Sequence, residues 1–247
     1  MHSILLIGQS NMAGRGELSN LPKMDTSRLY VMRNGRYQPL FRPVNPDRSF
    51  AGFNLAESFA EKYAKKYGVD VGLIPCADGG TSLSQWEVGS LLYENALNHA
   101  RLASRTSTIV AVLWHQGEAD CANELYPVYQ EKFEKILNGF RKELGLENVP
   151  FLLGGLGDFL ADCVLDEKLK NYAKVNEQLE KIAKENEKVG FVSATGLTAK
   201  ADNLHFDTNG LYEFGLRYFE KYEELRDERS IKESASADVI RTEMEKL

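Results

Sequence analysis

Cysteine and long apolar runs are both scarce in this chain of 247 residues. The three cysteines, Cys76, Cys121 and Cys163, are odd in number and widely spaced, so a disulfide framework is not expected. No segment approaches the roughly 20 apolar residues that a membrane-spanning helix needs. The N-terminus also lacks the basic segment and apolar stretch of a signal peptide. We therefore expect reduced thiols in a cytoplasmic protein that has no membrane partner.

An excess of positive charge is absent as well. The chain has 30 Lys and Arg residues against 36 Asp and Glu residues, which gives a net charge of −6 at pH 7. Proteins that bind nucleic acid or anionic membranes usually carry the opposite charge, so neither is expected as the main partner. The hydrophobic content of 43% and the charged content of 27% are typical of a globular domain.

Short apolar runs alternate with helical patterns along the chain. The runs predict five strands, at residues 3–7, 69–74, 108–114, 150–154 and 189–193. Amphipathic stripes over residues 55–67, 125–140 and 169–182 predict helices between them. This alternation predicts an α/β fold with a parallel sheet, formed by one domain at 1–220. A charged helix or tail follows at 221–247, and the run at 28–32 before Asn34-Gly35 predicts a small hairpin excursion.

Four polar segments follow predicted strands, and the first contains Ser10. It reads GQSNMAGRG at 8–16. A serine between a strand and a helix has an exposed hydroxyl, with backbone N–H groups nearby that can bind an oxyanion. A simple helix N-cap explains Ser10 equally well. A phosphate-binding loop does not fit, because the glycine spacing matches neither GxGxxG nor GxxxxGK[ST].

The second and third segments are DGGTS at 78–82 and WHQGEAD at 114–120. Paired glycines let the backbone approach a ligand and present an N–H group, although an ordinary turn also uses them. The third segment is denser in polar side chains than core packing requires. His115, Glu118 and Asp120 would allow a metal site, but the chain has only four histidines and no HExxH pattern, so no metal is expected.

The fourth segment, DNLH at 202–205, places Asp202 three residues before His205. Residues at this spacing on one turn can touch. A carboxylate on one ring nitrogen fixes the histidine tautomer and leaves the other nitrogen free as a general base. A D-x-x-H pair is common by chance, so its weight comes from its position near the end of an α/β chain that has a serine after the first strand.

Together the four segments resemble the SGNH hydrolase superfamily. More narrowly, they resemble its sialate O-acetylesterase and acetylxylan esterase branch, the family-six carbohydrate esterases. The matches are GQSNMAG at 8–14, GGTS at 79–82, HQGEAD at 115–120 and DNLH at 202–205, in order over about residues 1–220. The resemblance implies a three-layer α/β/α sandwich with a flavodoxin-like, mostly parallel sheet. It also implies that no metal or organic cofactor takes part.

The resemblance further implies roles for single residues. Ser10 is the nucleophile and His205 the base. The oxyanion donors are the backbone N–H groups of Ser10 and Gly80 and the side chain of Gln116, which stands where the wider superfamily has asparagine. Asp202 fits the superfamily's triad acid, whereas relatives in this branch can recruit the glutamate of HQGE, here Glu118. Candidate substrate contacts are Asn11 and Trp86. Trp86 and Trp114 together would give a wall on which a sugar stacks; core packing is the alternative for both tryptophans.

The sequence therefore predicts a serine esterase that removes an acyl group, acetyl above all, from a small carbohydrate. Two alternatives stay open. One is a short-chain esterase or thioesterase on the same fold, and the other is a carbohydrate-binding module without turnover. A homo-oligomer is compatible with the sequence.

Overall fold

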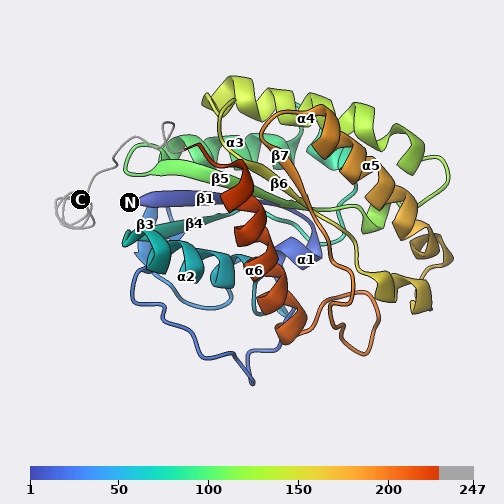
Figure 1. Cartoon of the computed structure of the whole chain (residues 1–247), viewed down its shortest axis with the longest axis horizontal. Coiled ribbons are helices and arrows are strands. Elements are labelled where there is room, and N and C mark those ends of the chain that lie inside the picture. The colour runs from blue at the N-terminus through green and yellow to red at the C-terminus, as the bar shows by residue number, and fades with distance from the viewer. Residues whose placement is uncertain (228–247) are drawn as a thin grey trace.

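A seven-stranded sheet lies between two layers of helices in the computed structural model, which describes residues 1–227 (Figure 1). The order of strands across the sheet is β3-β2-β4-β1-β5-β6-β7. All neighbouring strands are parallel except β2 and β3, which pair antiparallel. The strands are β1 (His2–Gly8), β2 (Leu29–Arg33), β3 (Arg36–Pro39), β4 (Val71–Pro75), β5 (Thr108–His115), β6 (Phe151–Gly154) and β7 (Val189–Val192).

The sheet is larger than the five strands that the sequence predicts. The predicted hairpin does not lie outside the sheet, because β2 pairs with β4 in parallel and extends the sheet. β3 then folds back on β2 through a turn in which Asn34 and Gly35 both adopt positive φ, at 49° and 77°. Asparagine and glycine tolerate this conformation, which explains the turn at this point. The predicted strand count is therefore corrected from five to seven.

Six α-helices connect the strands of the described chain. They are α1 (Ser10–Ala13), α2 (Leu55–Tyr67), α3 (Leu91–Ala103), α4 (Tyr129–Leu144), α5 (Tyr172–Glu185) and α6 (Thr208–Leu225). Short 3₁₀ helices form at Leu83–Trp86, Glu118–Asp120, Tyr126–Val128, Asp158–Asp162 and Glu167–Asn171. The stripes at 55–67, 125–140 and 169–182 correspond to α2, α4 and α5. α4 begins only at Tyr129, since Pro127 lies in the preceding 3₁₀ turn.

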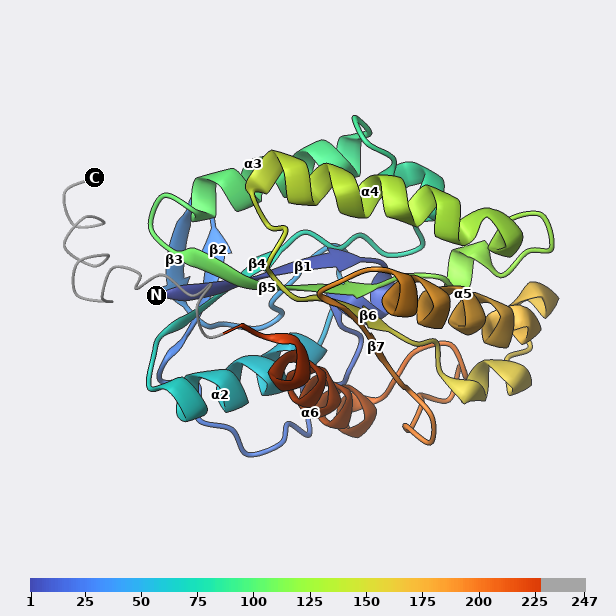
Figure 2. The same ribbon diagram turned by 45° about the horizontal axis from the view of Figure 1, so that its top comes forward.

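Helices α3, α4 and α5 cover one face of the sheet, and α2 and α6 cover the other (Figure 2). The two cores divide the alternating side chains of β1. Leu5 and Ile7 join the core under α3–α5, whereas Ile4 and Leu6 join the core under α2 and α6. Strand side chains point alternately to opposite faces, so an unbroken apolar strand such as β1 supplies both cores.

The last helix continues past the predicted boundary at residue 220. α6 ends at Leu225, and Tyr222 packs in the core under α2 and α6. The end of this helix therefore belongs to the α/β domain, not to a separate charged segment. Residues 228–247 of the predicted tail lie outside the described residues. Across residues 1–227, the helices are too short or too polar to cross a membrane.

Candidate active site

Ser10 is the first residue after the tight connection between β1 and α1. The preceding Gln9 donates its backbone N–H to the carbonyl oxygen of His115 at 2.8 Å. Gly8 allows this approach, because it has φ of 134° and a Cβ there would lie 2.1 Å from the same oxygen. Glycine is thus required where β1 meets the end of β5. Ser10 consequently stands at the carboxyl edge of the sheet, where ligand sites of open α/β sheets are found.

A chain of hydrogen bonds joins Ser10, His205 and Asp202. His205 Nε2 lies 3.1 Å from Ser10 Oγ, and His205 Nδ1 lies 2.8 Å from Asp202 Oδ2. The other carboxylate oxygen of Asp202 accepts the backbone N–H groups of Leu204 and His205, at 2.9 and 3.0 Å. A carboxylate on Nδ1–H leaves the Nε2 lone pair facing the serine hydroxyl. The structure therefore brings the three predicted residues into proton-transfer order.

The environment keeps Asp202 ionised. Partial burial opposes the charge, but hydrogen bonds from the His205 side chain and from the backbone N–H groups of His205 and Leu204 outweigh burial and lower the pKa of Asp202 below its usual value. A charged Asp202 can stabilise an imidazolium at His205.

The turn that carries His205 is fixed by its own backbone and by the start of α6. Lys200 donates its backbone N–H to the His205 carbonyl at 2.8 Å. Asp207 caps α6, because its side chain accepts the Gly210 N–H at 2.7 Å. The last part of the segment between β7 and α6, residues 200–207, is therefore held near both of its ends. This places His205 over Ser10.

Two backbone N–H groups beside Ser10 are free to bind an anion. Within residues 1–227, no hydrogen bond leads from the backbone N–H of Ser10 or of Gly80. The Gly79–Gly80 turn follows β4 and lies against Ser10, since a Cβ on Gly79 would be 3.4 Å from Ser10 Cβ. Gly80 has φ of 79°, a conformation that suits glycine. Together these groups form a candidate oxyanion hole.

The Gly79–Gly80 turn is held by an ion pair that the sequence does not indicate. Asp47 Oδ2 accepts the Gly79 N–H at 2.9 Å. The same carboxylate binds Arg15 through two hydrogen bonds, at 3.0 and 2.7 Å, and both side chains are 3% exposed. Arg15 lies inside the first motif, but nothing in the sequence links it to Asp47 in a loop. Buried bidentate pairs of this kind fix geometry well.

Gln116 is fully buried, and its amide group already has partners. Its amide nitrogen donates to the Thr81 carbonyl at 3.1 Å and to Asp120 at 2.5 Å. Its amide oxygen accepts the hydroxyl of Tyr129 at 3.0 Å. Gln116 would have to give up one of these bonds to bind an oxyanion. In this arrangement it instead ties the segment after β4 to the segment after β5.

Glu118 contacts Asn11 rather than His205. Its Oε1 accepts the Asn11 amide at 2.6 Å. Asn11 also donates to the Leu204 carbonyl at 3.2 Å and accepts the Phe206 N–H at 3.1 Å. Asn11 is 1% exposed and uses its whole amide in these bonds. The predicted contact of Asn11 with substrate is therefore corrected: Asn11 links the first, third and fourth motifs from inside the protein.

Comparison with known proteins identifies the family. The sequence profile of the family described as "Carbohydrate esterase, sialic acid-specific acetylesterase" matches residues 1–224. The chain belongs to this family. A probable carbohydrate esterase of Arabidopsis thaliana is 29% identical over 248 residues, which cover 88% of each chain. The predicted family and the predicted class, a carboxylic ester hydrolase, are confirmed.

Solved structures confirm the predicted fold class of this carbohydrate esterase. An X-ray structure of a protein from Arabidopsis thaliana has a TM-score of 0.80 and 26% identity, and the match covers 90% of this chain and 98% of that one. The crystal structure of NanS has a TM-score of 0.71 at 15% identity, with 90% and 96% covered. At that identity the second likeness concerns the fold alone.

The buried position of Trp86 corrects its predicted role as a substrate contact. The indole is 0% exposed and donates its N–H to Thr81 Oγ1 at 3.1 Å. It packs edge-on against Trp114, with ring centroids 5.6 Å apart. Both tryptophans therefore belong to the core of the esterase, and neither ring is open to a sugar.

The residues of the alternative metal site do not form a metal-binding group: His115 Nδ1 and Glu118 Oε1 lie 3.7 Å apart, but within residues 1–227 no three His, Cys, Asp or Glu side chains are placed to hold a metal ion. His115 Nε2 faces the Gly155 carbonyl at 3.2 Å, and burial lowers the pKa of this histidine. Asp120 accepts the Leu83 N–H at 2.8 Å, in addition to the amide of Gln116. Glu118 is directed to Asn11. Asp120 thus has its own hydrogen-bond partners, separate from the contact between His115 and Glu118.

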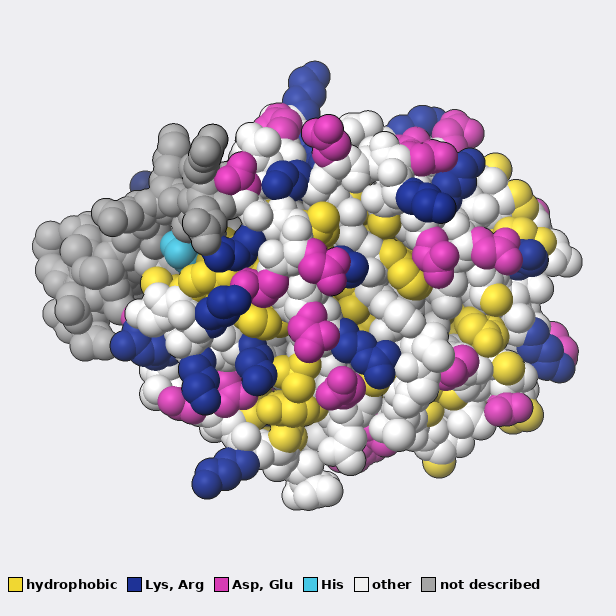
Figure 3. Space-filling view, in the orientation of Figure 1, with side chains coloured by type: hydrophobic (Ala, Val, Ile, Leu, Met, Phe, Trp, Pro, Cys, Tyr) yellow, Lys and Arg dark blue, Asp and Glu magenta, His cyan; other side chains and the backbone are white. Residues whose placement is uncertain are grey.

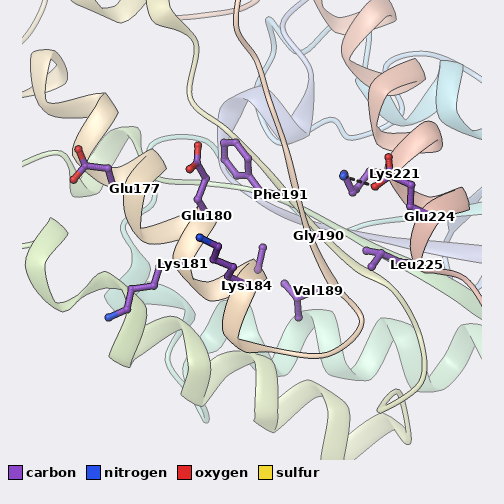
Figure 4. A pocket seen from close by; sticks show the side chains of 11 residues that line it. Glu177, Glu180, Lys181, Lys184, Val189, Gly190, Phe191, Lys221, Glu224 and Leu225 are labelled. Atoms are coloured by element: carbon purple, nitrogen blue, oxygen red, sulfur yellow. Dashed lines mark hydrogen bonds and ion pairs between the residues drawn. The ribbon is translucent and has the colours of Figure 1, made fainter.

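A separate cavity of about 610 Å³ lies between α5, β7 and α6 (Figure 4). Its walls carry both charges, including the ion pair of Lys221 with Glu224. Val189, Gly190 and Phe191 of β7 line it, whereas Ser10, Asp202 and His205 do not. The face drawn in Figure 3 likewise has Lys and Arg interspersed with Asp and Glu. Charge alone therefore does not mark a site on this face.

Proposed function

We propose that this carbohydrate esterase hydrolyses O-acetyl esters of carbohydrates through an acyl-enzyme, with Ser10 as nucleophile, His205 as base and Asp202 as the triad acid. The observation that carries the proposal is the hydrogen-bond chain from Ser10 Oγ through His205 to Asp202. It lies beside two free backbone N–H groups. The family description, with its sialic acid-specific acetylesterases, supports an acetylated sugar as substrate.

In the first step, His205 Nε2 takes the Ser10 proton while Oγ attacks the acetyl carbonyl carbon. The oxyanion forms between the backbone N–H groups of Ser10 and Gly80. The tetrahedral intermediate collapses as the bond to the sugar oxygen breaks, and the His205 imidazolium protonates that oxygen. Ionised Asp202 stabilises the imidazolium throughout. The sugar leaves as an alcohol, and acetyl-Ser10 remains.

In the second step, water replaces the sugar alcohol. His205 takes a proton from water, the hydroxide attacks acetyl-Ser10, and the same N–H groups hold the second oxyanion. Collapse breaks the bond to Ser10 Oγ, which regains its proton from His205, and acetate leaves. Gln116 supports both steps indirectly, because its bond to the Thr81 carbonyl fixes the turn that carries Gly80.

The experiment that tests this function combines a substrate screen with a Ser10→Ala variant. Acetate release is measured on acetylated xylo-oligosaccharides, O-acetylated sialic acids and 4-nitrophenyl acetate. We expect turnover of acetylated sugars by the native enzyme and a loss of about 10⁴-fold or more in Ser10→Ala. Ser84→Ala is the matched control, since Ser84 is an exposed serine in the turn after Gly80.

Labelling locates the nucleophile independently. A serine-directed organophosphonate should modify Ser10 alone, as read by peptide mass spectrometry. An adduct on another serine, or a Ser10→Ala variant that keeps more than about 1% of the rate, would rule out Ser10 as nucleophile. Preference for long-chain esters or thioesters over acetyl sugars would favour the lipid esterase or thioesterase alternative.

A further inference from the structure

Phe50 is an exposed aromatic ring beside the candidate site. Its side chain is 67% exposed, more than any other aromatic ring in residues 1–227. One side of the ring packs on the guanidinium of Arg15, whose Cζ lies 5.2 Å from the ring centroid. That guanidinium is itself buried and held by Asp47. The ring thus rests on a fixed support and leaves most of its surface to solvent.

The same guanidinium connects Phe50 to the nucleophile. A Cβ on Gly79 would lie 2.5 Å from Arg15 Nη2 and 3.4 Å from Ser10 Cβ. Arg15 and Ser10 therefore flank a single glycine of the candidate oxyanion turn. Since Phe50 packs on Arg15, a single side chain separates its ring from that turn.

The backbone on both sides of Phe50 is held in place. Arg48 donates to the Gly79 carbonyl at 2.9 Å, and its own carbonyl accepts the Ala51 N–H at 3.0 Å. Gly52 donates its backbone N–H to the Gly14 carbonyl at 3.0 Å. The exposed ring is therefore attached to the same segments that position Ser10 and Gly79. A surface that is already ordered loses little conformational entropy when a ligand binds.

We propose that Phe50 is the platform on which the sugar ring of the substrate packs while its acetyl group reaches Ser10. This inference rests on the proposed function. A pyranose has one face of C–H groups, and an aromatic ring with a negative face attracts C–H hydrogens and removes apolar area from water. Trp86, the residue that the sequence favours for such a contact, is buried. Phe50 instead offers an exposed ring one side chain away from the Gly79 turn that lies against Ser10.

The test compares a sugar ester with an ester that has no sugar. For Phe50→Ala, we expect kcat/KM on acetylated xylo-oligosaccharides or O-acetylated sialic acids, whichever the native enzyme hydrolyses, to fall about tenfold, mainly through KM. On 4-nitrophenyl acetate, kcat/KM should stay within about twofold, because that substrate makes no sugar contact. Phe50→Trp, which keeps an aromatic face, should retain the sugar activity.

Phe41→Ala is the matched control. Phe41 is 44% exposed and also packs on an arginine, Arg33, but Arg33 donates to the Pro43 and Val44 carbonyls and not to the Gly79 turn. Phe41→Ala should leave both substrates unaffected. A further control, Leu165→Ala, removes an apolar side chain that is 63% exposed on the segment after Cys163.

Three outcomes would contradict the proposal that the sugar ring packs on Phe50. Equal losses of kcat on both esters in Phe50→Ala would mean that the ring only shields Arg15 and its turn. Unchanged sugar kinetics in Phe50→Ala would exclude the contact, as would a KM effect confined to Leu165→Ala. The proposed function fails separately, if the native enzyme hydrolyses 4-nitrophenyl acetate but none of the acetylated sugars.

Discussion

Two groups of polar residues meet around Ser10, and they differ in their access to solvent. The open group consists of Ser10, Asp202 and His205; the side chains of Asp202 and His205 are 33% and 17% exposed, and Ser10, which His205 contacts, is 7% exposed. The closed group consists of Asn11, Gln116, Glu118 and Asp120, each of which is at most 4% exposed. Both groups come from the same four sequence motifs, but in the proposed mechanism only the open group exchanges protons with the substrate. The closed group can act only by holding the open one in position.

The hydrogen bonds of the two groups show the same division. The contacts of the open group run in one line from Ser10 through His205 to Asp202. In the closed group, Asn11 joins three motif segments and Gln116 joins two. Removing a buried partner leaves another polar group unpaired, which costs roughly 1–3 kcal/mol. Substitutions in the open group should therefore reduce turnover far more than stability, whereas those in the closed group should reduce both.

The largest effect is expected from His205→Ala. Loss of the base should lower kcat by about 10⁴-fold or more, with a much smaller effect on the melting temperature, because the ring is 17% exposed and fills no core position. Turnover of acetyl esters and thermal unfolding measure the two quantities. His99→Ala, on α3, is the control. A variant that unfolds well below the native protein would place His205 with the structural residues instead.

The next largest effect on kcat distinguishes the roles of the two carboxylates, Asp202 and Glu118. Asp202→Asn should lower kcat by about 10⁴-fold, because an amide favours the wrong histidine tautomer. Glu118→Gln should cost about 10–100-fold, through a loosened link between Asn11 and the site. Steady-state kinetics of both folded variants on one acetyl ester give the ranking. If Glu118→Gln proved the more damaging, Glu118 would be the triad acid and the division into two groups would be wrong.

A smaller effect on turnover, but a larger one on stability, is expected from Asn11→Ala. This change leaves the Phe206 N–H, the Leu204 carbonyl and Glu118 without their partner. The free energy of unfolding should fall by about 1–3 kcal/mol, measured by urea denaturation. Ser10→Ala, at the adjacent position, should leave it nearly unchanged. Equal stability of the two variants would contradict the closed group's supporting role.

The sequence allows the open group to be predicted more easily than its support. Ser10, Asp202 and His205 lie in short motifs after strands, and the Asp202–His205 contact is local. Asp47 and Phe50 lie in a loop without periodicity, and their place depends on contacts with Gly79 and Arg15 that only the folded chain creates. Such contacts have no signature in a single sequence.

The fold shows a similar limit. The five predicted strands are apolar runs, whereas β3, with the sequence RYQP, has no alternating pattern and is defined by its pairing with β2. Helix α3 was not predicted, because its buried face consists largely of Ala96, Ala100 and Ala103, which give a weak hydrophobic stripe. Trp86 was misplaced for the opposite reason: its polar neighbours predict a surface loop, but its ring fills the core.

The smallest and most specific expectation concerns pH, because the two groups shift their aspartates in opposite directions. Burial raises the pKa of Asp120 above its ordinary 3.8. The folded state then holds that proton more tightly, so this contribution to stability is present below pH 3.8 and is lost as the pH rises through the raised pKa. The pKa of Asp202 is lowered, because its hydrogen bonds outweigh burial. Its contribution is present above pH 3.8 and is lost as the pH falls through the lowered pKa.

We therefore expect the stability advantage of the native protein over Asp120→Asn to shrink with rising pH and its advantage over Asp202→Asn to grow. Urea unfolding of the three proteins from about pH 2 to about pH 7 covers both windows. If the free energy of unfolding changed with pH in the same way for both variants, the two aspartates would share one electrostatic environment. The open and closed groups would then not differ in how they shift a carboxylate pKa.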